Sequence, residues 1–157
     1  MNTYVRDNSK YLFDPPMCTA RKIGDISIPS ATLTQMTLPA EDFDTDGMHD
    51  PTTNNSRITC NHAGVYHASA SLIWAANNNG NRIMTIMLNN TTRQTQDWEE
   101  TPDGTNTTHL NCAQDVQMNV NDYLEIQASQ GTASGLNVNG GTDGGCVLSV
   151  HWVGSGV

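Results

Sequence analysis

The stretch Gly64-Val65-Tyr66-His67-Ala68-Ser69-Ala70-Ser71-Leu72-Ile73-Trp74 decides the fold of this chain. Successive side chains of an extended chain point to opposite sides, so every second residue shares a face. One face is apolar or aromatic throughout and consists of Tyr66, Ala68, Ala70, Leu72 and Trp74. The other face is mixed and consists of Val65, His67, Ser69, Ser71 and Ile73. This alternation predicts a strand over 64–75 with one core face and one mixed face.

The same alternation recurs along the chain, whereas no window of eleven residues keeps apolar residues at helical spacing. Turns rich in Asn, Gly and Pro separate the alternating segments, as in sandwiches and barrels of many short strands. The predicted strands are 17–22, 25–38 with a break at Pro29, 57–60, 64–75, 82–89, 92–99, 107–118, 122–129 and 145–153. We therefore expect an all-β fold with a single domain over 17–157, preceded by an N-terminal arm over 1–16 that lacks alternation.

The composition limits the classes of protein that fit. The chain has 157 residues, 7 Lys+Arg against 16 Asp+Glu, and a formal net charge of -9. This acidic balance argues against nucleic acid and anionic membrane surfaces as partners, because both attract clustered Lys and Arg. Neutral polar residues are abundant instead, with 17 Asn and 19 Thr. No apolar run approaches a membrane span and the first ten residues lack an apolar leader, so neither feature is expected.

Three segments give the chain a family resemblance. Residues 57–66 resemble the lead into the central strand of complement-type globular heads, which belong to the tumour-necrosis-factor-like jelly rolls. Asn121-Asp122-Tyr123-Leu124-Glu125-Ile126 resembles a later G-D-x-v-x-l strand, with Asn121 in place of the usual Gly, and 147–153 resembles the closing strand. The resemblance covers about residues 17–153. It implies a jelly-roll β-sandwich that forms homotrimers and binds proteins or glycans rather than catalysing a reaction.

The chain is also similar to the version of this fold found in bacteriophage structural proteins. The similar features are the acidic segment Phe43-Asp44-Thr45-Asp46-Gly47-Met48-His49-Asp50, the strand from Gly64 to Trp74, and Asn81-Arg82 with Ile86 and Asn89. The similarity implies a virion protein made in the bacterial host cytoplasm. It favours a trimeric decoration (cement) protein on the capsid surface that binds the major capsid protein or another virion protein. The alternative is a receptor-binding tip or head-fibre protein that recognises a host-surface glycan or protein.

The acidic segment raises the question of a metal site. Asp42, Asp44 and Asp46 stand at alternate positions before Gly47, as in the opening of a calcium-binding loop. The twelfth position holds Thr53 instead of a bidentate Glu, so the loop is incomplete on its own. Two hypotheses remain: a calcium site that an oxygen from a neighbouring subunit completes, and a solvated acidic loop whose Asp and Gly residues build turns.

Histidine and aromatic residues make up the expected trimer interface. His67 and His151 fall on the mixed faces of strands that are neighbours in the resembled jelly roll, and two histidines are too few to hold a metal. Tyr123 and Trp152 join them because the opposite faces of their strands also carry apolar groups. Residues 83–88 are likewise apolar on both faces, and a second apolar face needs a cover.

The four cysteines show no metal-binding spacing and stand at Cys18, Cys60, Cys112 and Cys146. We expect them to be buried and reduced. The alternative is a bridge between Cys18 and Cys146, because the first and last strands lie side by side in the resembled fold.

Catalytic motifs are missing from the sequence, and we expect a protein that is not an enzyme and needs no cofactor. Gly154-Ser155-Gly156 is a tail rather than a nucleophile elbow between a strand and a helix. Acidic residues flank Trp98 at Asp97, Glu99, Glu100 and Asp103. This arrangement suits either a sugar-binding platform or a hairpin with one packed Trp.

The arm carries more aromatic residues than a free tail needs. Tyr4, Tyr11 and Phe13 are a third of the nine aromatic residues of the chain, and the stiff Asp14-Pro15-Pro16 follows them. We expect Tyr4, Tyr11, Leu12 and Phe13 to become ordered on a binding partner, because aromatic anchors dominate such interfaces. The jelly roll is expected to be stable without the arm.

Overall fold

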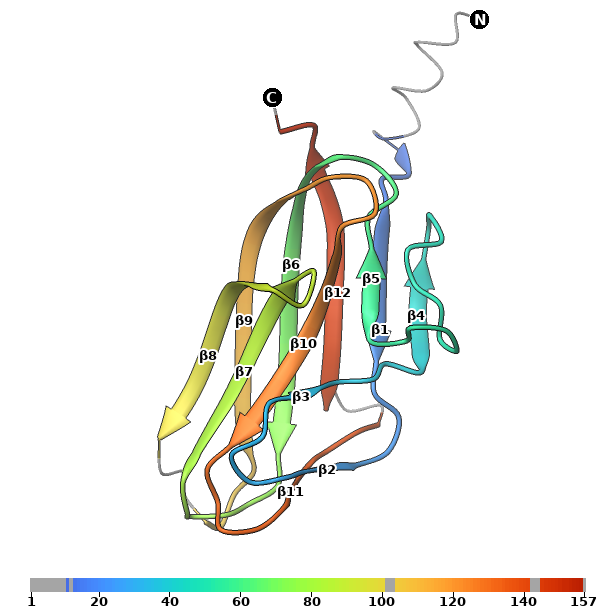
Figure 1. Cartoon of the computed structure of the whole chain (residues 1–157). Coiled ribbons are helices and arrows are strands. Elements are labelled where there is room, and N and C mark those ends of the chain that lie inside the picture. Colours follow the sequence, from blue (N-terminus) through green and yellow to red (C-terminus); the bar gives the residue numbers. More distant parts are fainter. Residues whose placement is uncertain (1–10, 12, 101–103, 142–144, 157) are drawn as a thin grey trace, which may run out of the picture.

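Residues 64–74 form the central strand of the protein, and every second residue along it is buried. The computed structural model describes residues 11, 13–100, 104–141 and 145–156. Within it, β6 (Gly64–Trp74) pairs antiparallel with β12 (Cys146–Gly154) on one side and with β9 (Thr108–Met118) on the other. Two antiparallel sheets pack face to face (Figure 1), and the expectation of an all-β sandwich is confirmed.

The two sheets differ in size. The larger sheet has the order β2-β11-β6-β12-β1-β4, with β9 also paired to β6. Its other strands are β1 (Met17–Arg21), β2 (Ile26–Ile28), β4 (Ala40–Asp44) and β11 (Leu136–Val138). The smaller sheet has the order β3-β10-β7-β8, with β5 also paired to β10. Its strands are β3 (Thr34–Gln35), β5 (Arg57–Thr59), β7 (Asn81–Leu88), β8 (Thr92–Glu100) and β10 (Tyr123–Gln130).

Three details correct the predicted strands. The first half of the acidic segment forms β4 instead of a loop, because its backbone pairs with β1 while its side chains stay largely exposed. The short β11 lies between two Gly-rich turns, in a segment where the sequence predicts no strand. The strand predicted over 25–38 breaks at Pro29 but leaves only the three residues of β2 and the two of β3. Among the described residues, no helix is long and apolar enough to cross a membrane.

The core lies between the sheets and is built on the apolar face of β6. Trp74 and Tyr66 are fully buried there, and the Tyr66 hydroxyl donates a hydrogen bond to the carbonyl of His62 over 2.8 Å. Side chains of β7 and β10 cover them from the other sheet, namely Met84, Ile86, Leu124, Ile126 and Ala128. Gly64 begins the strand because a Cβ there would lie 2.4 Å from Nε1 of Trp152.

Asp122 joins two turns at one end of the sandwich. Its Oδ2 accepts a hydrogen bond from the Asn119 backbone amide over 2.7 Å, and its Oδ1 accepts one from Asn89 Nδ2 over 2.7 Å. The side-chain oxygen of Asn89 accepts in turn from the Tyr123 amide. These donors lower the pKa of Asp122 below its usual range. Asn121 beside it has a φ of 71°, which explains why Gly is usual at this position in the resembled motif.

We expect Asp122→Ala to lower the free energy of unfolding by about 1–2 kcal/mol at pH 7, because it removes hydrogen bonds to a carboxylate. Since the pKa is lower in the folded state, this contribution is present above the unfolded pKa of about 3.9 and is lost as the pH falls through the folded value. Urea unfolding at pH 7 and near pH 2 measures both effects. Asp14→Ala controls for the loss of an exposed carboxylate. An equal difference between wild type and Asp122→Ala at both pH values would contradict the prediction.

Arg82 is a fully buried cation that organises the β6–β7 connection. Its Nη1 donates to the carbonyls of Asn79, Gly80 and Asn81 over 3.0, 3.2 and 2.9 Å, and its Nη2 donates to that of Asn77 over 2.9 Å. Burial lowers the pKa of the guanidinium from its ordinary value. The planar group therefore holds the loop through carbonyl dipoles.

Arg82→Lys should lower the free energy of unfolding by about 2–4 kcal/mol, because one ammonium group cannot reach all four carbonyls. Arg93→Lys, an exposed position on β8, serves as the matched control and should change it by less than about 0.5 kcal/mol. Thermal and urea unfolding compare the two variants. Equal losses in both would show that the loop does not depend on the guanidinium.

Candidate functional site

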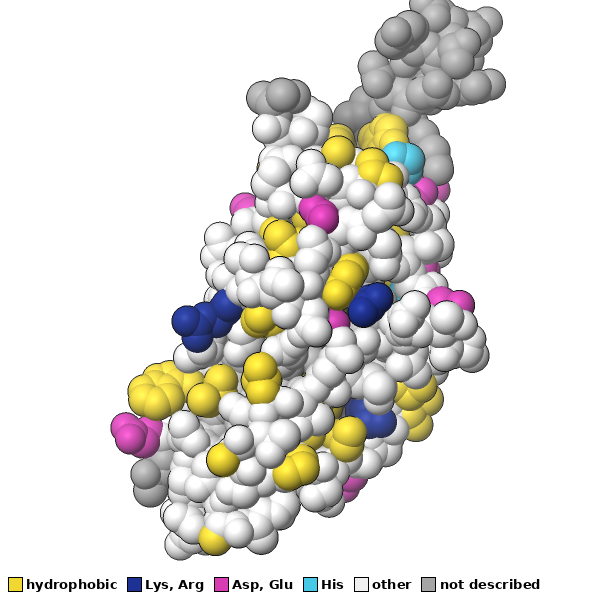
Figure 2. Space-filling model, viewed as in Figure 1, with side chains coloured by type: hydrophobic (Ala, Val, Ile, Leu, Met, Phe, Trp, Pro, Cys, Tyr) yellow, Lys and Arg dark blue, Asp and Glu magenta, His cyan; other side chains and the backbone are white. Residues whose placement is uncertain are grey.

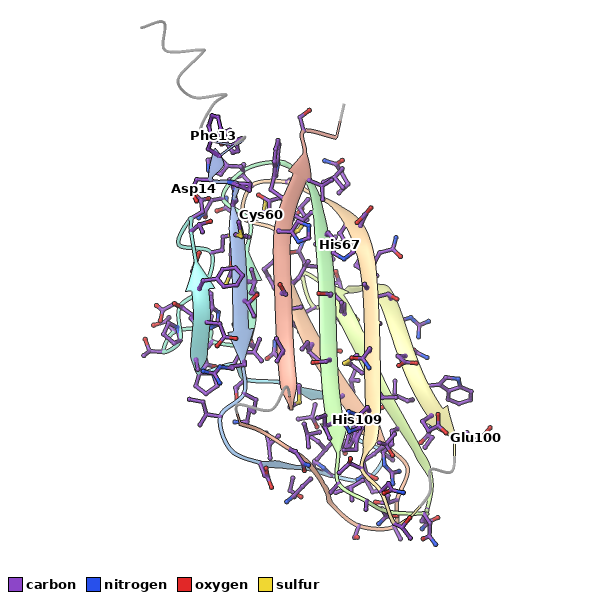
Figure 3. All side chains as sticks on the ribbon, turned by 180° about the vertical axis from the view of Figure 1, so that it is seen from behind. Phe13, Asp14, Cys60, His67, Glu100 and His109 are labelled. Atoms are coloured by element: carbon purple, nitrogen blue, oxygen red, sulfur yellow. The ribbon has the colours of Figure 1, made fainter. Side chains whose placement is uncertain are left out.

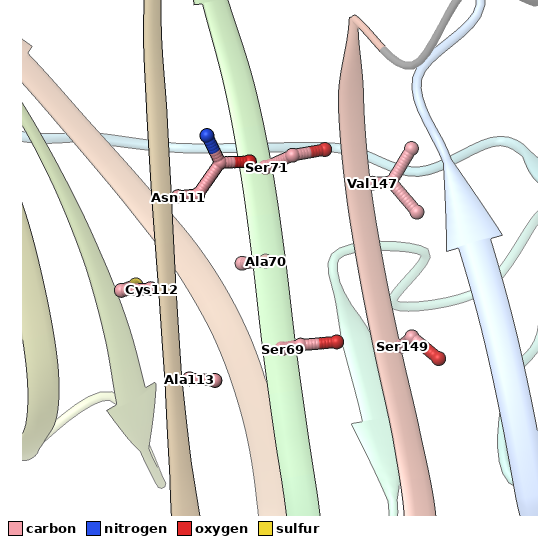
Figure 4. A pocket seen from close by; sticks show the side chains of 8 residues that line it. All are labelled: Ser69, Ala70, Ser71, Asn111, Cys112, Ala113, Val147 and Ser149. Atoms are coloured by element: carbon pink, nitrogen blue, oxygen red, sulfur yellow. The ribbon is translucent and has the colours of Figure 1, made fainter.

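The outer face of the larger sheet, which points away from the core, is the first candidate surface. Backbone registers between β12, β6 and β9 place its side chains in rows across the three strands. The rows are His151–His67–Asp115, Ser149–Ser69–Ala113 and Val147–Ser71–Asn111. The last two rows contain no charged side chain, and they line a shallow hollow of about 340 Å³ (Figure 4). We call these two rows the small-residue face.

The edge of the same sheet carries a large apolar side chain. Thr19 on β1 pairs with Ser149 on one side and with Phe43 on the other, so the serine row continues to β4. The Thr19 hydroxyl donates to Ser149 Oγ over 2.8 Å. The Phe43 side chain is 46% exposed. The outer face therefore combines a shallow hollow over β6 with a projecting ring at its edge.

The structure brings together the two histidines that the sequence singles out. His67 and His151 are directly opposite each other on β6 and β12, and their ring centroids lie 5.1 Å apart. His67 Nδ1 lies 2.7 Å from Oδ1 of Asp115 on β9. Figure 3 shows His67 on the face of β6 that is turned away from the smaller sheet. This histidine row borders the small-residue face.

The two aromatic residues expected in the same interface lie elsewhere. Trp152 follows His151 directly, so it points to the opposite side of β12 and packs against the core. Tyr123 belongs to the smaller sheet, where the guanidinium of Arg57 lies 4.1 Å from its ring centroid. His67, His151, Tyr123 and Trp152 therefore do not share one surface of a protomer. Trp152 is separated from the histidines because it points to the other side of its strand, and Tyr123 because it belongs to the other sheet.

The three carboxylates of the calcium hypothesis have different protein partners. Asp42 pairs with Arg21 over 2.7 Å. Asp44 accepts hydrogen bonds from the backbone amides of Asp46 and His49 over 3.1 and 2.9 Å. Asp46 Oδ2 lies 3.2 Å from His62 Nε2. Among the described residues, no three acidic, histidine or cysteine side chains form a group that could hold a metal ion. The calcium site that an oxygen from a neighbouring subunit completes stays a hypothesis.

The expected partner-binding arm is divided between docked and exposed side chains. Tyr4 and Leu12 lie outside the described residues. The Tyr11 ring packs against Trp152 and His62, with centroid separations of 5.1 and 5.4 Å. Phe13 is 86% exposed and projects beyond one end of the sandwich (Figure 3). Of the two described aromatic residues, only Phe13 has most of its ring available to a partner.

All four cysteines are free, and three of them are buried. Burial raises the pKa of Cys18 and of Cys146 to about 12, and burial with the nearby Asp97 raises that of Cys112 to about 11. The neutral thiol is a poor nucleophile, so these positions do not suit covalent catalysis. Although β1 and β12 are neighbours, Cys18 is opposite Val150 and does not meet Cys146.

The outer face of the smaller sheet is the second candidate surface. Its rows across β10, β7 and β8 are Ser129–Ile83–Trp98, Gln127–Thr85–Gln96 and Glu125–Met87–Arg93. A hollow of about 360 Å³ over these rows is lined by Leu33 and by members of every row, while Trp98 and Glu125 are not part of its lining. We call this hollow and its rows the sheet groove. Figure 2 shows hydrophobic side chains gathering over β7 and β8 on this side of the molecule.

Trp98 lies on strand β8 rather than packed within a hairpin loop. Its side chain is 52% exposed, and it is directly opposite Ile83. The expectation of a second apolar face on β7 is correct, since Ile83 and Met87 point outward while Met84 and Ile86 are buried in the core.

The small residues on the outer face of the larger sheet were not among the site residues predicted from the sequence. The available signal was the run from Ala68 to Ser71, which lacks any charge.

Comparisons with solved structures identify the architecture. The globular domain of zebrafish complement 1qA protein matches with a TM-score of 0.65 and 8% identity over 88% of this chain and 97% of that chain. Murine APRIL matches with 0.65 and 7% over 88% and 98%. Eiger TNF from S. frugiperda matches with 0.61 and 12% over 90% and 96%. No protein-family model and no curated protein sequence matches this chain. The likeness shows the fold, which is the jelly roll of complement heads and TNF-like proteins.

Proposed function

We propose that this chain is a non-catalytic structural protein that assembles into homotrimers through the small-residue face. The observation that carries the proposal is the absence of charge from two successive rows across β12, β6 and β9. An outward sheet face in contact with water usually carries polar and charged side chains. This chain has a net charge of -9, so charged side chains would be expected on such a face if water covered it. A neighbouring copy explains why the charges are kept to the edges of this face.

The exposed Phe43 indicates which two parts of neighbouring copies meet in the trimer. A ring projecting at the β4 edge of one copy fits the shallow hollow over β6 of the next copy, because both belong to the same sheet face. Such a contact joins two different patches, so it generates a closed ring when the rotation between copies is suitable. The expected threefold assembly of the resembled family is one such ring.

Within this assembly we propose the role of a bacteriophage capsid decoration protein. The support is the similarity of segments 43–50, 64–74 and 81–89 to phage structural proteins. Phe13, exposed at one end of the sandwich, supplies an aromatic anchor for the major capsid protein or another virion protein. The protein is then made in the host cytoplasm and resides on the capsid surface.

The second candidate is a receptor-binding tip or head-fibre protein, favoured by the exposed Trp98 beside the sheet groove. The copy number of the chain in purified virions separates the two candidates. A decoration protein covers the shell in many copies, whereas a tip is present in few. Quantitative gel staining against the major capsid protein measures this ratio.

Ser69→Arg should convert the trimer into a monomer of 17.0 kDa, because it places a long cation in the centre of the small-residue face. Light scattering at several concentrations measures the mass. Thr92→Arg, on the smaller sheet, adds the same charge and should leave the trimer intact. A wild-type chain that is monomeric at every concentration would disprove the assembly.

Phe13→Ala should weaken binding to phage particles stripped of the protein by about tenfold or more, because a large anchor is removed. The trimer mass should not change. Ile23→Ala provides a matched control, since Ile23 is also an exposed large hydrophobic residue, at 58%. Sedimentation of particles with labelled protein measures the affinity. Full occupancy by Phe13→Ala at wild-type concentrations would place the attachment elsewhere.

A further inference from the structure

We propose that the sheet groove is a binding site for neutral oligosaccharides. This inference deepens the receptor-binding candidate and does not rest on trimer assembly, because the groove lies on the opposite sheet from the small-residue face. Three features of the groove favour this ligand: an unpaired buried acceptor, a polar row between apolar neighbours, and the distribution of charge.

The unpaired acceptor belongs to Gln127, whose side chain is only 5% exposed. Its Nε2 donates to Glu125 Oε1 over 3.1 Å and also to Asn90 Oδ1. Its Oε1 is buried and has no hydrogen-bond partner. A buried acceptor without a partner destabilises the free protein, so a ligand hydroxyl that reaches it and donates a hydrogen bond removes this penalty.

The orientation of the Gln127 amide is fixed by its neighbours. A flipped amide would place its oxygen against two other oxygens, those of Glu125 and Asn90, and would lose both hydrogen bonds. Glu125 is itself fully buried, and its second oxygen accepts a hydrogen bond from Gln35 Nε2. The chain of contacts from Gln35 to Asn90 therefore holds the Gln127 amide in one orientation, with its oxygen unpaired, before any ligand binds.

Apolar side chains flank this polar row on both sides. Gln127, Thr85 and Gln96 form the row, with Ile83 in the neighbouring row on one side and Met87 in that on the other. Trp98 extends the Ile83 row with a half-exposed indole. A sugar ring has an apolar face of C–H groups and a rim of hydroxyls. It can therefore stack on the indole while its hydroxyls reach the amide and hydroxyl groups of the row.

The charges around the groove select a neutral ligand. Arg93 is the single cation among the residues that line the hollow, and its Nη1 donates to Gln96 Oε1 over 2.5 Å. Glu99 and Glu100 follow Trp98 on β8, and the whole chain carries a net charge of -9. Sulfated, sialylated and uronic-acid sugars would meet the net negative charge of the chain, which Arg93 offsets only locally, whereas neutral hexoses and N-acetylhexosamines meet no such repulsion.

Titration with neutral trisaccharides built from glucose, galactose or N-acetylglucosamine tests the site, with tryptophan fluorescence and calorimetry as readouts. We expect saturable binding of at least one sugar with a Kd below about 10 mM. Trp98→Ala and Gln127→Leu should each weaken it by about tenfold or more. Phe43→Ala, which removes an exposed ring from the other sheet, should leave the affinity unchanged. Gln96→Ala, at the exposed end of the row, replaces Gln127→Leu if that variant fails to fold.

Any of three outcomes would overturn the proposal. One is the absence of saturable binding of any trisaccharide in the panel by the wild-type protein. The second is binding that Trp98→Ala leaves intact, and the third is binding that occurs only with sialyllactose or another anionic sugar included for comparison. Ser69→Arg serves as a separate test of assembly. Sugar binding retained by this variant, whatever its mass, would show that the groove functions independently of the trimer.

Discussion

Strand β6 is hydrogen-bonded along both edges, to β12 and to β9, and this position makes its alternation the constraint on which the rest depends. Once Tyr66, Leu72 and Trp74 point into the core, the serines between them must point outward. Residues directly opposite each other in neighbouring strands point to the same side of the sheet. Ser149 on β12 and Ala113 on β9 are opposite Ser69, so they point outward with it. A shift by one residue would bury the serines and expose the aromatic residues, so the core and the small-residue face depend on the same register.

The sequence pattern succeeds where one face of a strand is buried. It predicts β6, β7, β10 and β12 closely, and the family resemblance adds that the strands of His67 and His151 are neighbours. It fails for β4, because a mostly exposed edge strand held by backbone hydrogen bonds leaves no apolar period. Trp152 was grouped with His151 although adjacent residues of a strand must face opposite sides.

The two candidate surfaces differ in how far the sequence could reveal them. The exposed Trp98 among acidic residues was visible as an open alternative, because its type and neighbours are unusual. The network of Gln35, Glu125, Gln127 and Asn90 was not visible, since it joins two strands, β3 and β10, and a turn that are distant in sequence. Glu125 and Gln127 alternate with the apolar core residues of β10, so the sequence pattern predicts that they face solvent. Nothing in the pattern therefore indicates that these polar side chains are buried. Only the register shows that they meet.

The buried thiols have a consequence for the environments in which this protein can function. A thiol with a pKa of about 12, such as that of Cys146, is almost entirely protonated near neutrality, so it reacts slowly with disulfides and peroxides. The geometry also offers no partner, because the registers keep Cys18 and Cys146 apart. A chain that folds with reduced thiols therefore keeps its covalent structure when its surroundings become oxidising. Its stability then depends on packing and hydrogen bonds, without cross-links that a change of redox potential would make or break.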